Sequence, residues 1–109
     1  MFIHKYTSTG GNNTIDHNLY FTTGTSRWIW NGSEYTDFNA WKTASNCDAG
    51  STNGIDPLFV STTLPDLHIR PLSPAKNSGL VISKAVNGGT DMDGKQRMLK
   101  SKISKGAYQ

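Results

Sequence analysis

The sequence has few of the residue types on which several common architectures depend. Cysteine occurs once, at Cys47, which excludes an internal disulfide framework and a four-cysteine zinc site. Glutamate also occurs once, and charged residues make up only 17% of the chain, which excludes a coiled coil or a helical bundle. No apolar run approaches the roughly 18 residues of a membrane span, and the first residues lack the apolar core of a signal peptide.

Small polar residues are abundant where charged and hydrophobic residues are scarce. Serine, threonine, asparagine and glycine account for 43 of the 109 residues, and only 35% of the chain is hydrophobic. A free domain of this length buries roughly 65% of the surface that its unfolded chain exposes. We therefore expect a polar chain, rich in β-structure or loops, whose core is marginal for a lone domain and sufficient for a part that docks on something else.

Short apolar segments alternate with long polar loops along the chain. Segments rich in β-formers predict strands of a few residues each at 1–9, 14–21, 27–30, 55–60 and 67–69. Asn31-Gly32 predicts a tight hairpin turn, and a short helix is expected within 34–45, where Asp37 can act as the N-cap. Ordinary domains rarely carry so much loop, whereas a β-solenoid combines short strands with outward loops. The pattern favours an all-β solenoid.

Five motifs in the second half carry a resemblance to a known family. They are Asp56-Pro57-Leu58-Phe59-Val60, Asp66-Leu67-His68-Ile69, Ser73-Pro74-Ala75-Lys76-Asn77-Ser78-Gly79, Asp91-Met92-Asp93-Gly94-Lys95-Gln96-Arg97 and Gly106-Ala107-Tyr108. In this order and spacing they resemble the C-terminal end of secreted bacterial proteins of the pectate-lyase-like superfamily, a likeness that extends over about residues 14–109. It implies a fragment of an all-β, right-handed parallel β-helix, made of the last coils and a C-terminal cap with long irregular loops. It also implies a location outside the cell or on its surface.

The same resemblance implies how the chain is organised. Residues 1–60 are expected to form terminal β-helix coils, with a loop or short helix inserted near 34–45, and residues 61–109 a capping segment. Because relatives of this kind are much longer, we expect a fragment of a longer protein, a truncated gene product or a very short relative. The first coil would then expose an uncapped end, so we also expect the isolated chain to self-associate through its N-terminal coil.

Four aromatic residues are the candidate substrate-binding side chains: Trp28, Trp30, Tyr35 and Trp41. Aromatic faces stack on sugar rings, and ligand clefts combine rigid aromatic side chains with a few polar groups. The alternative is that the four rings form the core of a loop or small helix packed on a sheet. From the sequence both interpretations stay open.

Candidate metal and nucleophilic residues are few. Asp91 and Asp93 have the first spacing of a calcium loop, but Lys100 stands where such a loop needs a glutamate, so a structural turn is the other interpretation. The three histidines lack metal-ligand spacing. Cys47 has no base that the sequence assigns to it. Apart from calcium at Asp91 and Asp93 we expect no cofactor, and we assign no catalytic residue.

Three functional hypotheses follow. The first is the C-terminal part of a β-helix protein that binds or processes polysaccharide, with no complete active site in this chain. If that protein is an enzyme, it is a polysaccharide lyase or glycoside hydrolase whose catalytic residues lie on upstream coils. The second is a non-catalytic structural or adhesive β-helix module. The third is a small basic protein that binds nucleic acid or a partner through residues 94–109, which hold five cations and no acid.

A glycan is the partner that we favour. No recognised nucleic-acid motif accompanies the basic residues, so nucleic acid is the weaker hypothesis. No membrane partner is expected, because the chain has no apolar segment of sufficient length.

Overall fold

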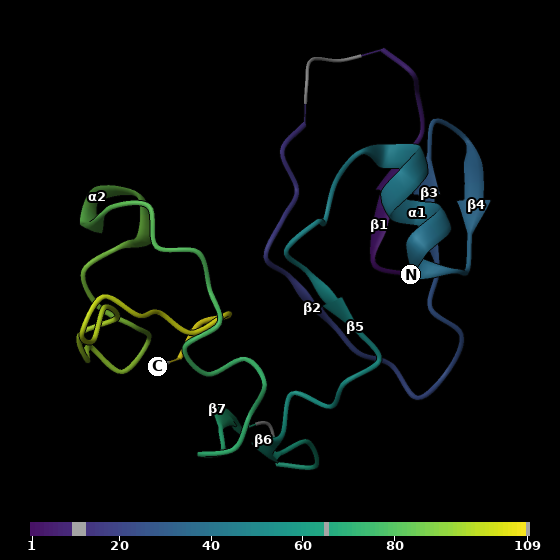
Figure 1. The fold of residues 1–109 in the computed structure, drawn as a ribbon. Coiled ribbons are helices and arrows are strands. Elements are labelled where there is room, and N and C mark those ends of the chain that lie inside the picture. Colours follow the sequence, from purple (N-terminus) through teal and green to yellow (C-terminus); the bar gives the residue numbers. More distant parts are fainter. Residues whose placement is uncertain (10–12, 65, 109) are drawn as a thin grey trace. The chain divides into compact units, whose positions relative to one another are not determined.

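The computed structural model describes residues 1–9, 13–64 and 66–108 of the chain (Figure 1). It divides into two compact units, Met1–Gly54 and Ile55–Gln109. Among the described residues, each unit has its own short strands and one helix. Within the described ranges, no helix combines the length and the apolar character that crossing a membrane requires.

A three-stranded sheet forms the base of the first unit. β1 (Ile3–Lys5), β3 (Trp28–Trp30) and β4 (Ser33–Tyr35) lie in the order β1-β3-β4, with β1 parallel and β4 antiparallel to β3. Asn31 and Gly32 close the β3–β4 hairpin with φ of 52° and 82°. A two-residue turn with positive φ at both positions favours asparagine and glycine. The turn predicted from the sequence is confirmed.

The helix α1 (Phe38–Ser45) follows this hairpin. Asp37 caps its N-terminus, because the carboxylate Oδ1 accepts a hydrogen bond from the backbone N–H of Ala40 at 2.8 Å. Asn46 ends the helix in the left-handed region, with φ of 53°. This is the short helix, with the cap, that the sequence predicted within 34–45.

Aromatic side chains fill the space between α1 and the sheet. Trp28 and Trp30 alternate with Ile29 on β3, so both indole rings lie on one face, and the register places Tyr35 opposite Trp28. Trp41 of α1 stacks on Trp28 with 6.2 Å between ring centroids and meets Trp30 edge-on at 5.4 Å. The other members of this cluster are Phe2, Ile3, Tyr20 and Phe38. The first unit therefore has an aromatic core.

A parallel ribbon and a buried carboxylate complete the first unit. β2 (Leu19–Tyr20) pairs in parallel with β5 (Thr52–Asn53). Asp48, which is fully buried, accepts hydrogen bonds from four side chains: Asn18 Nδ2 at 3.0 Å, Tyr20 Oη at 2.8 Å, Trp41 Nε1 at 2.9 Å and Ser51 Oγ at 2.5 Å. A buried charge is tolerated when donors satisfy it in this way. The carboxylate joins α1 to the ribbon.

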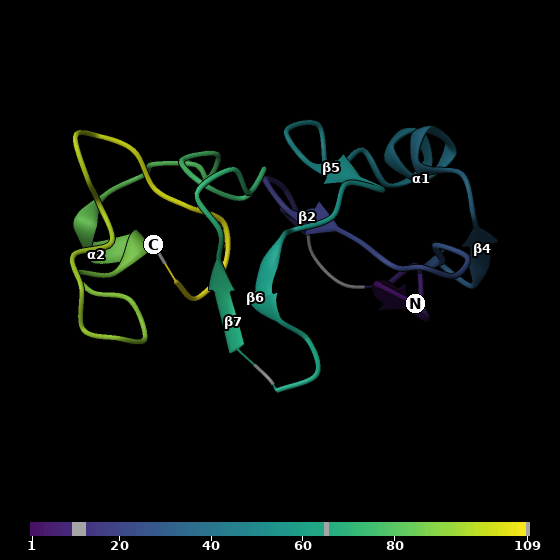
Figure 2. The same cartoon turned by 90° about the horizontal axis from the view of Figure 1, so that it is seen from below.

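The second unit is built mainly from turns (Figure 2). β6 (Phe59–Ser61) and β7 (Asp66–Ile69) form an antiparallel hairpin, and α2 (Lys84–Asn87) is a single helical turn capped by Ser83. In the described residues of this unit, Ala75 and Ile103 are the only buried apolar side chains. Hydrogen bonds of the loops, more than a core, hold this unit together.

The structure corrects the expected fold class. In a right-handed parallel β-helix the strands of successive coils stack into long parallel sheets. Here β1–β3 and β2–β5 are parallel pairs, but they belong to two separate short sheets, and β4 and the β6–β7 hairpin pair in the antiparallel direction. The chain is a small mixed protein of short strands and helices, and the predicted all-β solenoid fragment with a C-terminal cap is wrong.

The observed units also differ from the expected division. The sequence predicts β-helix coils over 1–60 and a cap over 61–109, whereas the structure divides after Gly54. β6 pairs with β7 across the expected boundary, because a strand and its hairpin partner fold as one element. No coil end is present at the described N-terminal residues, and self-association of the chain stays a prediction that light scattering would test.

Candidate functional site

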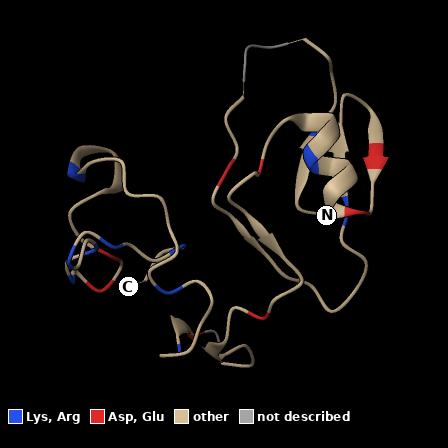
Figure 3. Cartoon of the chain, viewed as in Figure 1, with Lys and Arg blue, Asp and Glu red and all other residues tan. Residues whose placement is uncertain are grey.

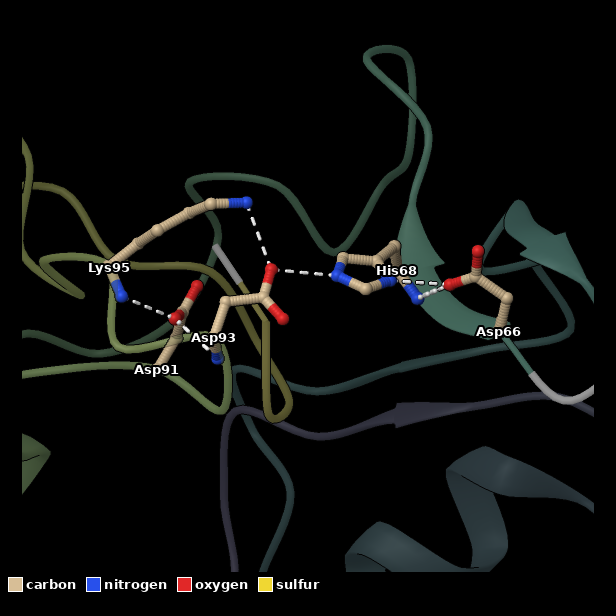
Figure 4. A network of polar contacts seen from close by, with 5 residues as sticks. All are labelled: Asp66, His68, Asp91, Asp93 and Lys95. Carbon is tan, nitrogen blue, oxygen red and sulfur yellow. Dashed lines mark hydrogen bonds and ion pairs between the residues drawn. The ribbon is translucent and has the colours of Figure 1, made fainter.

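A row of alternating charges lies in the second unit (Figure 4). Asp66 and His68 are two residues apart on β7, so they share one face of the strand. His68 Nδ1 contacts Asp66 Oδ1, and His68 Nε2 lies 2.8 Å from Asp93 Oδ2. The same Asp93 oxygen accepts a hydrogen bond from Lys95 Nζ at 2.9 Å. We call Asp66, His68, Asp93 and Lys95 the charge row.

Asp91 builds the turn that presents two members of the charge row. Its Oδ1 accepts hydrogen bonds from the backbone N–H groups of Asp93 at 2.9 Å and Lys95 at 2.8 Å. The Asp91 N–H in turn donates to the Lys95 carbonyl at 2.8 Å. Gly94 takes φ of 77° between them, a conformation that glycine adopts without steric cost. Buried Asp91 therefore acts as the turn's internal acceptor.

The charge row shifts the pKa of each member toward its charged form. Hydrogen bonds to Asp93 and Asp66 raise the pKa of the His68 imidazole above its ordinary value of 6.5. The hydrogen bond to His68 lowers the pKa of Asp66, and those to Lys95 and His68 lower the pKa of Asp93. All four side chains are partly exposed, so solvent screens these attractions.

A small apolar pocket adjoins the charge row. The ring of Tyr108 lies against the His68 imidazole in a tilted arrangement, with 4.1 Å between ring centroids and 33° between ring planes. Tyr108 also lines a pocket of about 220 Å³ whose remaining walls are Phe59, Leu67, Ile69, Lys105, Gly106 and Ala107. Two aromatic rings and aliphatic side chains therefore meet charged groups at the Tyr108 side of the pocket.

Both nitrogens of His68 are engaged, which limits what the imidazole can do. A general base needs a nitrogen that can reach the proton it removes, whereas Nδ1 and Nε2 each face a carboxylate. Ligand sites combine apolar walls with a few placed polar groups. The arrangement is therefore better suited to recognising a ligand than to proton transfer.

The aromatic residues predicted to bind substrate belong to the first unit, whereas the pocket beside the charge row belongs to the second. Trp28 and Trp41 are fully buried, so neither ring offers a face to a sugar in this structure. Trp30 and Tyr35 are partly buried against the same cluster, and Lys5 Nζ lies 4.4 Å from the Trp30 ring centroid. The core interpretation accounts for these rings, and substrate binding at Trp30 and Tyr35 stays a prediction.

The calcium hypothesis for Asp91 and Asp93 also stays a prediction. Oδ1 of Asp91 accepts from two backbone N–H groups, and Oδ2 of Asp93 faces His68 and Lys95. Across the parts of the chain that the structure describes, no group of three or more histidine, cysteine, aspartate or glutamate side chains is arranged to hold a metal ion.

The sequence contained only part of the signal for this site. The spacing of Asp66 and His68 indicates that they share a face of a strand. Asp93 and Tyr108 come from loops far along the chain, and no local pattern indicates that they return to β7.

Comparisons with protein-family models, with curated proteins and with solved structures find no match to the chain. The resemblance to pectate-lyase-like proteins stays a prediction that these comparisons do not test, although the β-helix that it implied is not the fold of this chain. The function must therefore be inferred from the geometry of the site.

Proposed function

We propose that the protein binds a glycan without cleaving it, and that the pocket lined by Phe59, Ile69 and Tyr108 takes one sugar ring. The observation that carries the proposal is the contact of the Tyr108 ring with the His68 imidazole, which joins an aromatic pocket to the charge row. A sugar ring has apolar faces and polar edges. An aromatic ring can cover the face while nearby charged side chains form hydrogen bonds with the hydroxyl groups.

The size of the pocket supports a ring that belongs to a longer polymer. Its volume of about 220 Å³ lies below the roughly 300–1,000 Å³ of sites that enclose a whole small ligand. A single sugar residue needs less space, and its neighbours in the polymer can run over the exposed surface. The proposal therefore concerns polysaccharides or oligosaccharides.

The carboxylates support binding more than hydrolysis. Glycoside hydrolysis uses two carboxyl groups on opposite sides of the scissile bond, one of them protonated. Asp66 and Asp93 instead face the same imidazole, and hydrogen bonds lower the pKa of both. Neither carboxyl group is suited to donate a proton near neutral pH.

Titration of the full chain with a panel of oligosaccharides, followed by calorimetry, tests this proposal. We expect Tyr108→Ala to weaken binding by at least about tenfold, the equivalent of roughly 1.4 kcal/mol of lost ring contact. Tyr108→Phe keeps the ring and should keep most of the affinity. Tyr6→Ala removes an exposed ring of the first unit and serves as the control. Binding that is insensitive to Tyr108→Ala, or a chain that binds no glycan, would contradict the proposal.

A further inference from the structure

A second hollow in the second unit is lined by cationic side chains. Its walls are Lys76, Asn77, Leu99, Lys100 and Lys102, around a cavity of about 470 Å³. No acidic residue contributes to this lining, and the ion pairs in the described ranges include none of the three lysines. Figure 3 shows lysine and arginine positions spread along the C-terminal loops of this unit. We call the five residues that line this hollow the lysine pocket.

A tight turn fixes two of the three lysines. Lys100 and Ser101 take φ of 49° and 60°, and Leu99 and Lys102 exchange backbone hydrogen bonds of 3.0 and 2.9 Å around them. Residues other than glycine enter this left-handed region at a steric cost. The turn holds the backbone of Lys100 and Lys102 in place before any ligand arrives.

The third lysine is held by a different turn. The N–H of Lys76 donates to the Ser73 carbonyl at 3.1 Å, and the next residue, Asn77, takes φ of 57°. The Asn77 N–H donates to Ser104 Oγ at 3.2 Å. Three positive side chains are thus gathered on a preorganised backbone, which reduces the ordering that binding requires.

We propose that the lysine pocket binds the anionic substituent, a carboxylate or sulfate group, of an acidic polysaccharide. This inference rests on the proposed function and adds the charge class of the glycan. Lysine binds anions as a compact point charge with three donors, and the lysine stems and Leu99 supply apolar walls. The lysine pocket is a hollow, so it can admit a carboxylate or sulfate group that projects from the polysaccharide.

The lining favours an acidic glycan over single-stranded nucleic acid. Proteins that bind single strands combine cations with aromatic rings on which the bases stack. No aromatic ring lines the lysine pocket. Nucleic acid is therefore an outcome that the experiment must separate from the proposed one.

Binding of the full chain to four probes tests the inference: dextran sulfate, polygalacturonate, uncharged dextran and duplex DNA. We expect the two acidic polysaccharides to bind at least tenfold more tightly than dextran, with affinities that fall as salt is added. The triple variant Lys76→Gln, Lys100→Gln, Lys102→Gln should lose at least tenfold of the affinity for the acidic probes. The control variant Lys5→Gln, Lys42→Gln, Lys84→Gln loses the same net charge outside the pocket and should change little.

The outcomes distinguish the pocket from the proposed function. If Tyr108→Ala loses glycan binding while the triple variant keeps its affinity for the acidic probes, the lysine pocket is overturned and the sugar site at Tyr108 stands. If the triple variant loses affinity for the acidic probes while Tyr108→Ala keeps it, the lysine pocket stands and the sugar site at Tyr108 is overturned. DNA bound more tightly than either acidic polysaccharide, or no preference for acidic probes over dextran, would overturn the inference. Should the triple variant not fold, Lys102→Gln against Lys84→Gln gives the same comparison.

Discussion

Asp48 shows how a single residue can organise the packing of the first unit. Its carboxylate is removed from water, and four side chains donate to it from α1, from β2 and from the loops beside them. Burial, together with the hydrogen bond to Asp48, raises the pKa of the Tyr20 hydroxyl. The hydroxyl therefore remains protonated, and a donor, at neutral and mildly alkaline pH.

Replacing this carboxylate should destabilise the first unit strongly. Asp48→Asn exchanges one acceptor oxygen for an NH₂ group that faces other donors, and we expect a loss of roughly 3 kcal/mol in the free energy of unfolding. Tryptophan fluorescence during urea unfolding measures this unit selectively, because all three tryptophans lie in it. Asp37→Asn is the matched control, since asparagine caps a helix as well as aspartate does. Equal midpoints for the two variants would refute this role of Asp48.

His68 gives the second unit a dependence on pH. Its raised pKa means that its stabilising charge is fully present below pH 6.5 and is lost as the pH rises through the folded-state value. Asp66 and Asp93 have lowered pKa values, so their contribution is present above pH 3.8 and is lost as the pH falls through those lowered values. The charge row is therefore complete between about pH 3.8 and 6.5 and weakens on either side.

Titration of the His68 ring by nuclear magnetic resonance measures this effect. We expect a midpoint above 6.5, and a midpoint closer to 6.5 in Asp93→Asn, because the hydrogen bond to Asp93 is the largest cause of the shift. Signals of the Tyr108 ring should follow the same midpoint, since the centroids of the two rings are 4.1 Å apart. Asp56→Asn removes a carboxylate that caps the Leu58 N–H and should leave the midpoint unchanged. A wild-type midpoint at or below 6.5 would contradict the prediction.

At the scale of elements, turn chemistry decides how the strands meet. Asn31-Gly32 fits the positive φ of the β3–β4 hairpin, whereas Lys100-Ser101 makes a similar turn from residues that disfavour it. Strained positions of this kind concentrate at functional sites. The residues of the first turn suit its conformation, so the need to form the hairpin accounts for them. The second turn contains Lys100, which lines the lysine pocket.

Gly32→Ala should weaken the β3–β4 hairpin. The added methyl group has space, with the nearest atom, the Tyr6 carbonyl oxygen, at 3.8 Å, so the cost comes from the backbone at φ of 82°. We expect a loss of about 1 kcal/mol in the stability of the first unit, read from tryptophan fluorescence. Gly24→Ala, where φ is not positive and the nearest atom is also at 3.8 Å, is the control. An equal effect of the two substitutions would refute the turn as the cause.

At the scale of the whole molecule, the two units differ in what stabilises them. The first buries Tyr20, Trp28 and Trp41 together, whereas Ala75 and Ile103 are the buried apolar side chains among the described residues of the second. Apolar burial is the main source of stability in folded proteins. Units of about 55 residues have little stability to spare.

We therefore expect two unfolding transitions, with the second unit unfolding at the lower urea concentration. Tryptophan fluorescence follows the first unit, and the nuclear magnetic resonance signals of Tyr108, which lies in the second, follow the other. The charged groups of the second unit should also make its transition the more sensitive to pH. Coincident transitions from the two probes would show that the units unfold together and would contradict this prediction.

Local signals were sufficient for several elements. The N-cap at Asp37, the alternation of Trp28 and Trp30 and the dipeptide Asn31-Gly32 each fix the conformation of neighbouring residues, and α1, β3 and the hairpin turn follow from them. The short helix α2 was not predicted, because a single capped turn leaves almost no periodic pattern to detect.

The sequence by itself determined the polar, loop-rich character of the chain, its short strands, the helix α1 and the absence of a disulfide framework. Only the tertiary structure decided which strands pair, that the tryptophans form a core, and that Asp93 and Tyr108 meet His68. The physical reason is the separation along the sequence of the residues that interact: caps and turns act between residues a few positions apart. Strand pairing and side-chain clusters instead depend on which distant segments the loops bring together. Short alternating segments fit a solenoid and separate small sheets equally well.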